Sequence, residues 1–331
     1  MIITKTPFRI SLFGGGSDFP QWYESNLGRV ISFTIDKYCY ISARYLPPFF
    51  KHKFRIVYSK TEEVSDISLI KHPAVREALK LYKITNGLEL HHFGDLPARS
   101  GVGSSSAFAV GLLYALSKLN SREMVKKDLA QKAIDLEQNK LKENVGSQDQ
   151  IACTYGGFNE IIFEKDKWTL NPIVLNLDYQ NEIEDRMILV FSGVTRNSTD
   201  ISKGLISNYS QKELLIKSMV SLSGIAFDLL QKHGNLDELG ILLNEAWTIK
   251  KELNPMTTNK NLDDLYSYAM NNGALGGKVL GAGGGGFMLF WLKKGQKARF
   301  YNALKHSIVV PFSLEFNGCE TILDSTKERV K

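Results

Sequence analysis

Apolar and polar positions in the first third of the chain form short runs that predict β-strands. The runs are rich in β-branched and aromatic side chains, which pack well on a pleated sheet. The predicted strands are residues 8–13, 30–35, 38–45, 54–58 and 88–93. We therefore expect the chain to begin with a β-sheet.

Two helices with different apolar patterns follow. The stretch 104–119 is apolar nearly all round, which is typical of a buried helix. Residues 122–139 carry apolar side chains at helical spacing with polar residues between them, which predicts an amphipathic helix.

The arrangement restarts after residue 180. A strand is predicted at 186–193, and further helices and a strand follow at 211–232, 236–253, 261–272 and 287–292. Strands, then helices, then strands favour an α+β fold over an alternating, doubly wound sheet. Because no repeat or low-complexity linker separates the halves, we expect two closely packed domains, residues 1–180 and 181–331.

The composition is that of a globular protein. The 331 residues are 43% hydrophobic and 23% charged, which excludes wholesale disorder. A formal net charge of +6 suits a phosphorylated ligand, but it equally suits a solvated surface. Basic residues form no block and no stripe interleaved with aromatic residues, so we expect no nucleic-acid partner.

Cysteine usage and the lack of long apolar runs favour a cytoplasmic protein. Cys39, Cys153 and Cys319 lie far apart, which argues against both a disulfide framework and a zinc site. The segment MIITKTPFRI does not resemble a secretion signal, and no run approaches the roughly 18 apolar residues that a membrane span needs. We expect no membrane partner, while the sequence leaves the choice between monomer and homodimer open.

The strongest chemical signal is the segment 95–107 (DLPARSGVGSSSA), which opens the buried helix. Gly101 and Gly103 let the backbone approach a ligand closely. The serines that follow begin the helix, where unpaired N–H groups and a partial positive charge attract phosphate. An ordinary serine-capped turn is the alternative, but the combined pattern favours a phosphate site.

This loop is not a common nucleotide motif. A Walker A loop ends in Gly-Lys-Ser/Thr, and no lysine follows Gly103. The run GVGSSS also lacks the third glycine of a Rossmann fingerprint. The phosphate loop must therefore belong to another class.

Two further glycine-rich segments follow or precede strands. The run FGGGSD at 13–18 implies a sharp turn or a close backbone approach, and Asp18 could accept hydrogen bonds from sugar hydroxyls or simply lie on the surface. The run GAGGGG at 281–286 has the spacing G-x-G-x-x-G, but a strand rather than a helix follows it, which excludes dinucleotide binding. It is either a loop that closes over a ligand or a hairpin-like turn.

An acidic pair lies beyond the buried helix. Glu137 is near the end of the second helix, and Asp149 lies in the run GSQDQ. Phosphoryl transfer needs an oxygen ligand for magnesium and a residue that orients or deprotonates the attacking hydroxyl, and this pair could supply both. An exposed helix-surface charge is the alternative for Glu137.

In order along the chain, these segments resemble the three motifs of the GHMP kinases, a family that includes galactokinase, homoserine kinase, mevalonate kinase and phosphomevalonate kinase. TPFRISLFGGGSDFP is similar to the first motif, PARSGVGSSSAF to the second and KVLGAGGGGF to the third. The resemblance implies a ribosomal-protein-S5-like N-terminal domain packed on a ferredoxin-like C-terminal domain. It also implies that ATP and Mg²⁺ are the cofactors and that the other ligand is a small molecule.

The resemblance implies roles for individual residues. Asp149 matches the catalytic aspartate, and Arg9 matches the arginine beside it in sugar-kinase members. Ser105 and Glu137 match the magnesium ligands. We further expect Arg99, Gly101, Val102, Gly103, Ser104, Ser105 and Ser106 to bind ATP, and Gly15, Gly16, Asp18, Gly283, Gly284, Gly285 and Arg196 to bind the substrate, with Arg44 a second candidate for the substrate's phosphate.

Within the family, FGGGSDFP, GSQDQ and GALGGKVLGAGGGGF look most like the heptose 7-phosphate kinases and the fucose-kinase-like domains. Galactokinases carry a Gly-Glu-His-Thr-Asp-like run where this chain has Gly-Gly-Gly-Ser-Asp. The resemblance thus implies ATP-dependent phosphorylation of the anomeric C1 hydroxyl of D-glycero-D-manno-heptose 7-phosphate. The product would be a 1,7-bisphosphate on the route to nucleotide-activated heptose.

Other functions remain open at this point. The chain could be a kinase for another sugar, of the fucose or galactose type, or for a mevalonate-type alcohol. It could instead be a catalytically silent sugar and ATP sensor, or an S5-like RNA-binding protein. Retention of both carboxylates, Glu137 and Asp149, favours an active enzyme, since a sensor need not keep them.

Overall fold

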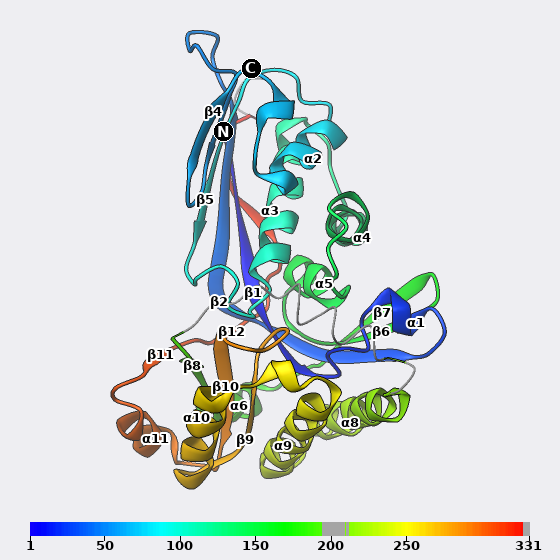
Figure 1. Cartoon of the computed structure of the whole chain (residues 1–331), viewed down its shortest axis with the longest axis vertical. Coiled ribbons are helices and arrows are strands. Elements are labelled where there is room, and N and C mark those ends of the chain that lie inside the picture. The colour runs from blue at the N-terminus through cyan, green and yellow to red at the C-terminus, as the bar shows by residue number, and fades with distance from the viewer. Residues whose placement is uncertain (194–208, 210–211, 327–331) are drawn as a thin grey trace.

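A computed structural model describes residues 1–193, 209 and 212–326 of the chain. Within this part, two β-sheets are stacked along the long axis of the molecule, each with its own helices (Figure 1). The strands are β1 (Ile2–Phe13), β2 (Gly28–Tyr45), β3 (Phe54–Val57), β4 (Thr61–Val64), β5 (Leu88–Gly94), β6 (Phe158–Glu164), β7 (Lys167–Pro172), β8 (Met187–Phe191), β9 (Ala274–Val279), β10 (Phe287–Leu292), β11 (Ile308–Val310), β12 (Leu314–Glu315) and β13 (Glu320–Asp324). The α-helices are α1 (Pro20–Tyr23), α2 (Pro73–Leu81), α3 (Ser104–Leu119), α4 (Lys126–Asp135), α5 (Gln148–Tyr155), α6 (Leu177–Arg186), α8 (Glu213–Gln231), α9 (Leu236–Leu253), α10 (Lys260–Asn271) and α11 (Lys297–Ala303).

The first sheet is built around the long strand β2. The main strand order is β13-β1-β2-β5-β3-β4, while β6 and β12 pair with other parts of β2, and β7 pairs with β6. The sequence predicted two strands, 30–35 and 38–45, where the structure has one. Asp36 and Lys37 form a bulge opposite the Pro7–Phe8 step of β1, so these polar residues interrupt the apolar pattern without ending the strand.

Helices α2 to α5 cover one face of this sheet, and α3 lies closest to it (Figure 1). The prediction of a buried helix over 104–119 is confirmed, since α3 has those bounds and most of its residues are buried. The helix predicted over 122–139 differs from the observed one, since α4 begins only at Lys126. It ends as an α-helix at Asp135 and continues as a π-helical turn, Leu136–Lys140, which ends in the loop before α5.

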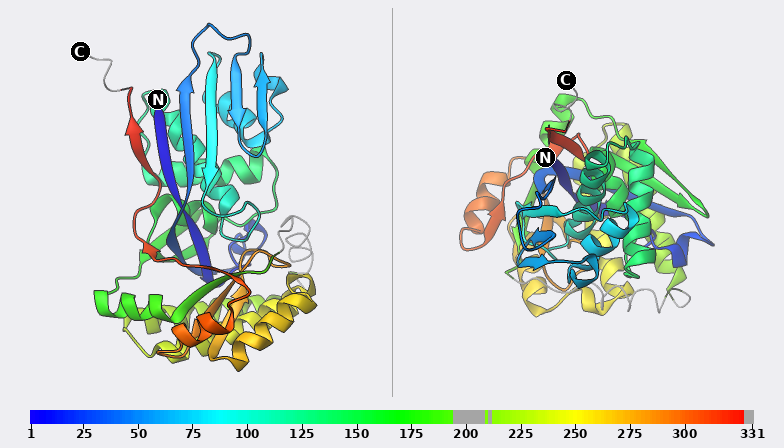
Figure 2. Two further views of the ribbon diagram at one scale, coloured as in Figure 1. Left: turned by 90° about the vertical axis from the view of Figure 1, so that its left-hand side faces the viewer. Right: turned by 90° about the horizontal axis from the view of Figure 1, so that it is seen from above.

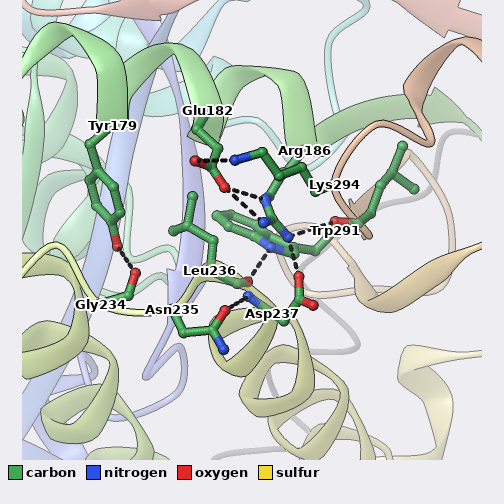
Figure 3. A network of polar contacts seen from close by, with 10 residues as sticks. Tyr179, Glu182, Arg186, Gly234, Asn235, Leu236, Asp237, Trp291 and Lys294 are labelled. Carbon is green, nitrogen blue, oxygen red and sulfur yellow. Dashed lines mark hydrogen bonds and ion pairs between the residues drawn. The ribbon is translucent and has the colours of Figure 1, made fainter.

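The second sheet has the strand order β11-β8-β10-β9, and α9 packs against β9. A polar network joins its elements (Figure 3). Arg186 at the end of α6 is buried and pairs with Glu182 at 2.8 Å and with Asp237 of α9, and Trp291 of β10 donates to the Leu236 carbonyl at 2.8 Å. The network fixes α6, α9 and β10 relative to one another, at a distance from the pocket described below.

The chain crosses back to the first sheet after β11. Strand β12 pairs with β2, and β13 pairs with the outer edge of β1 (Figure 2). Sequence analysis did not predict these two short strands. The division into residues 1–180 and 181–331 stays a prediction.

Within the described residues, none of the helices combines the length and the apolar character that crossing a bilayer requires.

Candidate active site

A pocket lies where the two sheets meet. It is lined by the end of β1 and the loop after it, by the starts of α3 and α5, by the end of α9, and by the loop that joins β9 to β10. All three glycine-rich segments of the sequence therefore reach one cavity.

The phosphate loop forms one side of the pocket and leads into α3. Gly103 is the N-terminal cap of α3 with φ of 72°, a left-handed conformation that a side chain would strain. A Cβ at Gly101 would lie 2.6 Å from the Leu280 carbonyl oxygen, so the loop packs directly on the third glycine-rich segment. The predicted ATP residues that line the pocket are Arg99, Gly101, Gly103, Ser104, Ser105 and Ser106.

Val102, the remaining residue of that prediction, does not line the pocket. Its side chain is fully buried in the core, and its carbonyl oxygen accepts a hydrogen bond from the Arg9 N–H at 3.0 Å. Val102 therefore attaches the phosphate loop to β1.

Arg9 and Asp149 form a bidentate ion pair at the centre of the pocket. Arg9 Nε donates to Asp149 Oδ1 at 2.6 Å, and Nη2 donates to Oδ2 at 2.5 Å. Arg9 Nη1 donates to the Gly101 carbonyl at 2.7 Å, which ties the pair to the phosphate loop. The Arg9 side chain is 5% exposed and that of Asp149 is 23% exposed, so the aspartate is the partner that a ligand can reach. The structure thus brings together the two residues predicted to be catalytic.

Glu137 lies behind the phosphate loop, buried rather than on the helix surface. Ser105 Oγ donates to its Oε1 at 2.7 Å, and Ser106 Oγ donates to its Oε2 at 2.6 Å. Gln150 Nε2 donates to Oε2 at 2.5 Å. Burial raises the pKa of Glu137 to about 7, although these three donors oppose the shift. The π-helical turn is the local reason that this side chain points inward, and such turns are frequent at functional sites.

The first glycine-rich loop places Asp18 on the opposite side. The Gly16 N–H donates to Asp18 Oδ1 at 3.0 Å. Burial and the nearby charge of Asp149 raise the pKa of Asp18 above its ordinary value. A Cβ at Gly146 would lie only 1.8 Å from Asp18 Oδ2, so that glycine leaves the room the carboxylate occupies. Gly15 and Gly16 line the pocket with Asp18, as predicted.

The third glycine-rich segment closes the remaining side. Gly283 and Gly285 line the pocket. Gly284, also predicted to contact substrate, is not among the lining residues, and its N–H donates to the Thr257 carbonyl at 2.8 Å. The segment is a tightly packed turn rather than a loop open to solvent.

Of the two arginines proposed for the substrate's phosphate, the one in the described part of the chain does not line the pocket. Arg44 lies on β2 and pairs with Glu89 of β5 at 2.6 Å, outside the pocket. Arg196 lies outside the described residues.

Two lysines that sequence reasoning missed line the pocket instead. Lys250 at the end of α9 donates to the carbonyls of Val279 at 3.0 Å and Gly281 at 2.6 Å. Lys278 of β9 is 3% exposed and donates to the Leu12 carbonyl at 3.0 Å. Burial, with the nearby Arg9 guanidinium, lowers the pKa of Lys250 to about 7, and burial holds the pKa of Lys278 well below its usual range.

Comparisons with known proteins identify the family. The chain matches the GHMP kinases N terminal domain over residues 68–157 and the GHMP kinases C terminal domain over residues 226–309. It is 28% identical to D-glycero-alpha-D-manno-heptose 7-phosphate kinase of Campylobacter jejuni, over 97% of this chain and 98% of the relative. It is 26% identical to galactokinase of Pyrococcus furiosus, over 94% of this chain and 95% of that relative.

A solved structure gives the same result for the fold. A D-glycero-D-manno-heptose 1-phosphate kinase from Bacteroides thetaiotaomicron aligns with a TM-score of 0.81 at 22% identity, over 98% of this chain and 100% of that chain. The predicted α+β fold and the predicted family are confirmed. ATP is the phosphoryl donor that membership of a kinase family implies. The chain belongs to the GHMP kinase family and is a phosphotransferase that acts on the hydroxyl group of a sugar or other alcohol.

Proposed function

We propose that this chain is an ATP-dependent sugar kinase that phosphorylates the anomeric C1 hydroxyl of D-glycero-D-manno-heptose 7-phosphate. The observation that carries the proposal is the similarity to the Campylobacter jejuni enzyme, which extends along 97% of this chain rather than through the motifs alone. The galactokinase match is lower in identity, and the mevalonate kinase matches cover less of the chain.

The ATP phosphates bind at the N-terminus of α3 in this proposal. Ser104 and Ser105 begin this helix and line the pocket, and the unpaired N–H groups of a helix N-terminus attract negative charge. Arg99 lines the same side and adds a positive charge.

Ser105 and Glu137 fit a magnesium ion. A hydroxyl that lines the pocket and a carboxylate bonded to it offer the oxygen ligands that Mg²⁺ prefers, and Mg²⁺ usually takes only one or two carboxylates. No cluster of three or more acidic, histidine or cysteine side chains offers an alternative metal site in the described part of the chain. When bound, the ion would neutralise charge on the ATP phosphates.

Asp149 and Arg9 act on the reacting groups. The C1 oxygen of the sugar bonds to the γ-phosphorus while the bond from the γ-phosphorus to the bridging oxygen breaks, and ADP leaves with that electron pair. Asp149 orients the C1 hydroxyl and accepts its proton through lone pairs that Arg9 leaves free. The Arg9 guanidinium stabilises the charge that develops on the transferred group.

Lys250 and Lys278 hold the phosphate that the substrate already carries. Each is an amine side chain that lines the pocket, and among the described residues each donates hydrogen bonds to backbone carbonyls. A phosphate dianion would supply the charge partner that favours their protonated forms.

The test is ATP consumption with Mg²⁺ over a panel of acceptors. The panel is heptose 7-phosphate, heptose 1-phosphate, unphosphorylated heptose, galactose, fucose and mevalonate. We expect strong preference for heptose 7-phosphate, with a 1,7-bisphosphate product identified by phosphorus NMR. Preference for heptose 1-phosphate would reverse the proposed position of transfer, and preference for another sugar would contradict the substrate while keeping the kinase. No consumption with any sugar, although ATP binds, would contradict the sugar kinase itself.

A further inference from the structure

Two residues that line the pocket each have a buried polar atom without a hydrogen-bond partner in the part of the chain that the structure describes. These atoms are Ser11 Oγ and Gln148 Oε1. Ser11 is 5% exposed and Gln148 is 6% exposed, and both residues line the pocket. Buried polar groups are nearly always hydrogen-bonded in native proteins, so these two atoms indicate a partner that the chain itself does not supply.

The two side chains lie on either side of Gly15. A Cβ at Gly15 would be 3.5 Å from Ser11 Oγ and 3.8 Å from Gln148 Nε2. Since Gly15 has no side chain and itself lines the pocket, no side chain at this position comes between the two polar groups and a ligand.

The orientation of the Gln148 amide is set by its neighbour. Its side-chain hydrogen bond to Asp18 favours the ionised carboxylate over the protonated acid. Because an ionised carboxylate can only accept, the amide NH₂ is the group that donates. The amide oxygen Oε1 is thereby left free to accept. Only a ligand that carries an O–H or N–H group can satisfy this oxygen, which excludes a fully ionised phosphate.

Both residues are next to the catalytic pair. Ser11 is two positions from Arg9 on β1, so their side chains point to the same face of the sheet. Gln148 immediately precedes Asp149 in the first turn of α5. A group bound by Ser11 and Gln148 would therefore lie close to the hydroxyl that receives the phosphoryl group.

We propose that Ser11 and Gln148 bind hydroxyl groups of the acceptor that flank the reacting hydroxyl. The ligand class is a polyhydroxylated acceptor, a sugar with vicinal hydroxyls, because each hydroxyl can donate to Oε1 and can accept from or donate to Oγ. The two residues are specificity determinants for the acceptor rather than catalytic residues. The inference rests on the proposed sugar kinase function but not on heptose as the sugar.

The first test is Ser11→Ala, in which affinity and stability should change in opposite directions. The substitution removes a group that has no protein partner, so the thermal midpoint should stay the same or rise. The KM for the acceptor should rise about 3–10-fold, the effect of one lost hydrogen bond. Ser17→Ala is the matched control, because Ser17 Oγ donates to the Gly14 carbonyl at 2.8 Å and accepts from the Arg29 N–H at 3.0 Å, and its loss should lower the thermal midpoint.

The second test uses deoxy analogues of whichever sugar in the panel the wild-type enzyme uses best. For the wild-type enzyme, kcat/KM should be lower with the analogue that lacks the hydroxyl next to the reacting one than with the parent sugar. In Ser11→Ala and Gln148→Met, kcat/KM should fall much less from the parent sugar to the analogue, because these variants already lack the contact with that hydroxyl.

The outcomes separate this inference from the proposed substrate. If a sugar other than heptose 7-phosphate is preferred, the substrate is wrong, and the same comparison with that sugar still tests Ser11 and Gln148. Wild-type KM in Ser11→Ala, or equal losses with the analogue in wild type and both variants, would overturn the inference. Preference for mevalonate over every sugar would overturn it as well.

Discussion

The two sides of the pocket differ in how completely the protein satisfies its own polar groups. On the side of the phosphate loop, the charged groups of Arg9, Asp149 and Glu137 are paired or accept several hydrogen bonds. On the side of the acceptor, two side-chain oxygens have no partner among the described residues, and two lysines donate to backbone carbonyls. The groups on this second side are Ser11, Gln148, Lys250 and Lys278.

This difference indicates how the two sides use binding energy. The phosphate-loop side is assembled before any ligand arrives, which is what stabilisation of a transition state requires. The acceptor side is completed by the substrate, so its groups discriminate between acceptors. Substitutions on the first side should lower turnover and disturb the structure, whereas those on the second should lower affinity and leave stability intact.

The largest effect is expected for Asp149→Asn. Turnover should fall about 10²–10⁴-fold, because the amide can neither accept the proton nor balance the Arg9 charge. Since Arg9 stays buried with a weaker partner, the free energy of unfolding should fall by about 1–3 kcal/mol. Steady-state kinetics, urea unfolding and ATP titration measure the three quantities, and ATP affinity should change little. Turnover close to wild type would remove Asp149 from the mechanism.

Glu137→Gln should act through the metal. The Mg²⁺ concentration for half-maximal activity should rise about 10–100-fold, because a neutral amide is a much weaker ligand than a carboxylate. Glu143→Gln is the control, since Glu143 is a nearby acidic residue, whereas the hydroxyls of Ser105 and Ser106 donate to Glu137. If both variants need the same Mg²⁺ concentration for half-maximal activity, Glu137 is not a magnesium ligand.

Lys250→Met should reduce the preference for a phosphorylated acceptor. The ratio of kcat/KM for heptose 7-phosphate to that for heptose should fall about 10-fold, the effect of one charge-assisted hydrogen bond. Lys251→Met is the control, because Lys251 neighbours Lys250 in sequence but does not line the pocket. If turnover falls equally with both acceptors, Lys250 acts on the ATP phosphates instead.

The last effect concerns the pH dependence of stability, and it is small within any single pH unit. The folded pKa of Lys250 is about 7, below the ordinary lysine value, so the unfolded chain binds a proton that the folded chain does not hold between about pH 7 and 10. The free energy of unfolding of wild type should therefore rise with pH in this window, by at most about 1.4 kcal/mol per pH unit for each such group.

The variant Lys250→Met shows how much of this pH dependence of the free energy of unfolding is due to Lys250. The charged groups around Lys250 remain in the variant; they are Arg9, Asp18 and Lys278. Because the pKa of Lys278 is also lowered, Lys278 by itself makes the free energy of unfolding rise with pH. Urea unfolding at pH 7, 8 and 9 should give a shallower slope for the variant than for wild type. Identical slopes would show that Lys250 keeps its proton in the folded protein.

Sequence predicted the elements whose pattern is local. The apolar circumference of 104–119 was enough to predict α3, and the glycine-rich segments were enough to predict which loops meet at the pocket. Sequence could not show that Glu137 is buried, because a π-helical turn carries no clear signature and the usual position of a glutamate is the surface.

The acceptor side was harder to predict because its residues are far apart in the sequence and come together only in the folded chain. Lys250 and Lys278 come from a helix and a strand of the C-terminal part, and nothing in their spacing distinguishes them from surface lysines. Ser11 and Gln148 lie within recognised motifs, but only the absence of a partner in the folded chain draws attention to them.

The pairing of β13 with β1 has a consequence for how the protein is synthesised. Ile2–Phe13 leaves the ribosome roughly 300 residues before Glu320–Asp324, which pairs with the outer edge of its first residues, a delay of about 15–60 s at ~5–20 residues per second. During that time the nascent chain carries a strand with one unpaired edge, the kind of surface on which strands of other chains assemble. The first sheet is therefore finished only after Glu320–Asp324 has been made, and a chain that stops before Glu320 keeps an edge open to aggregation.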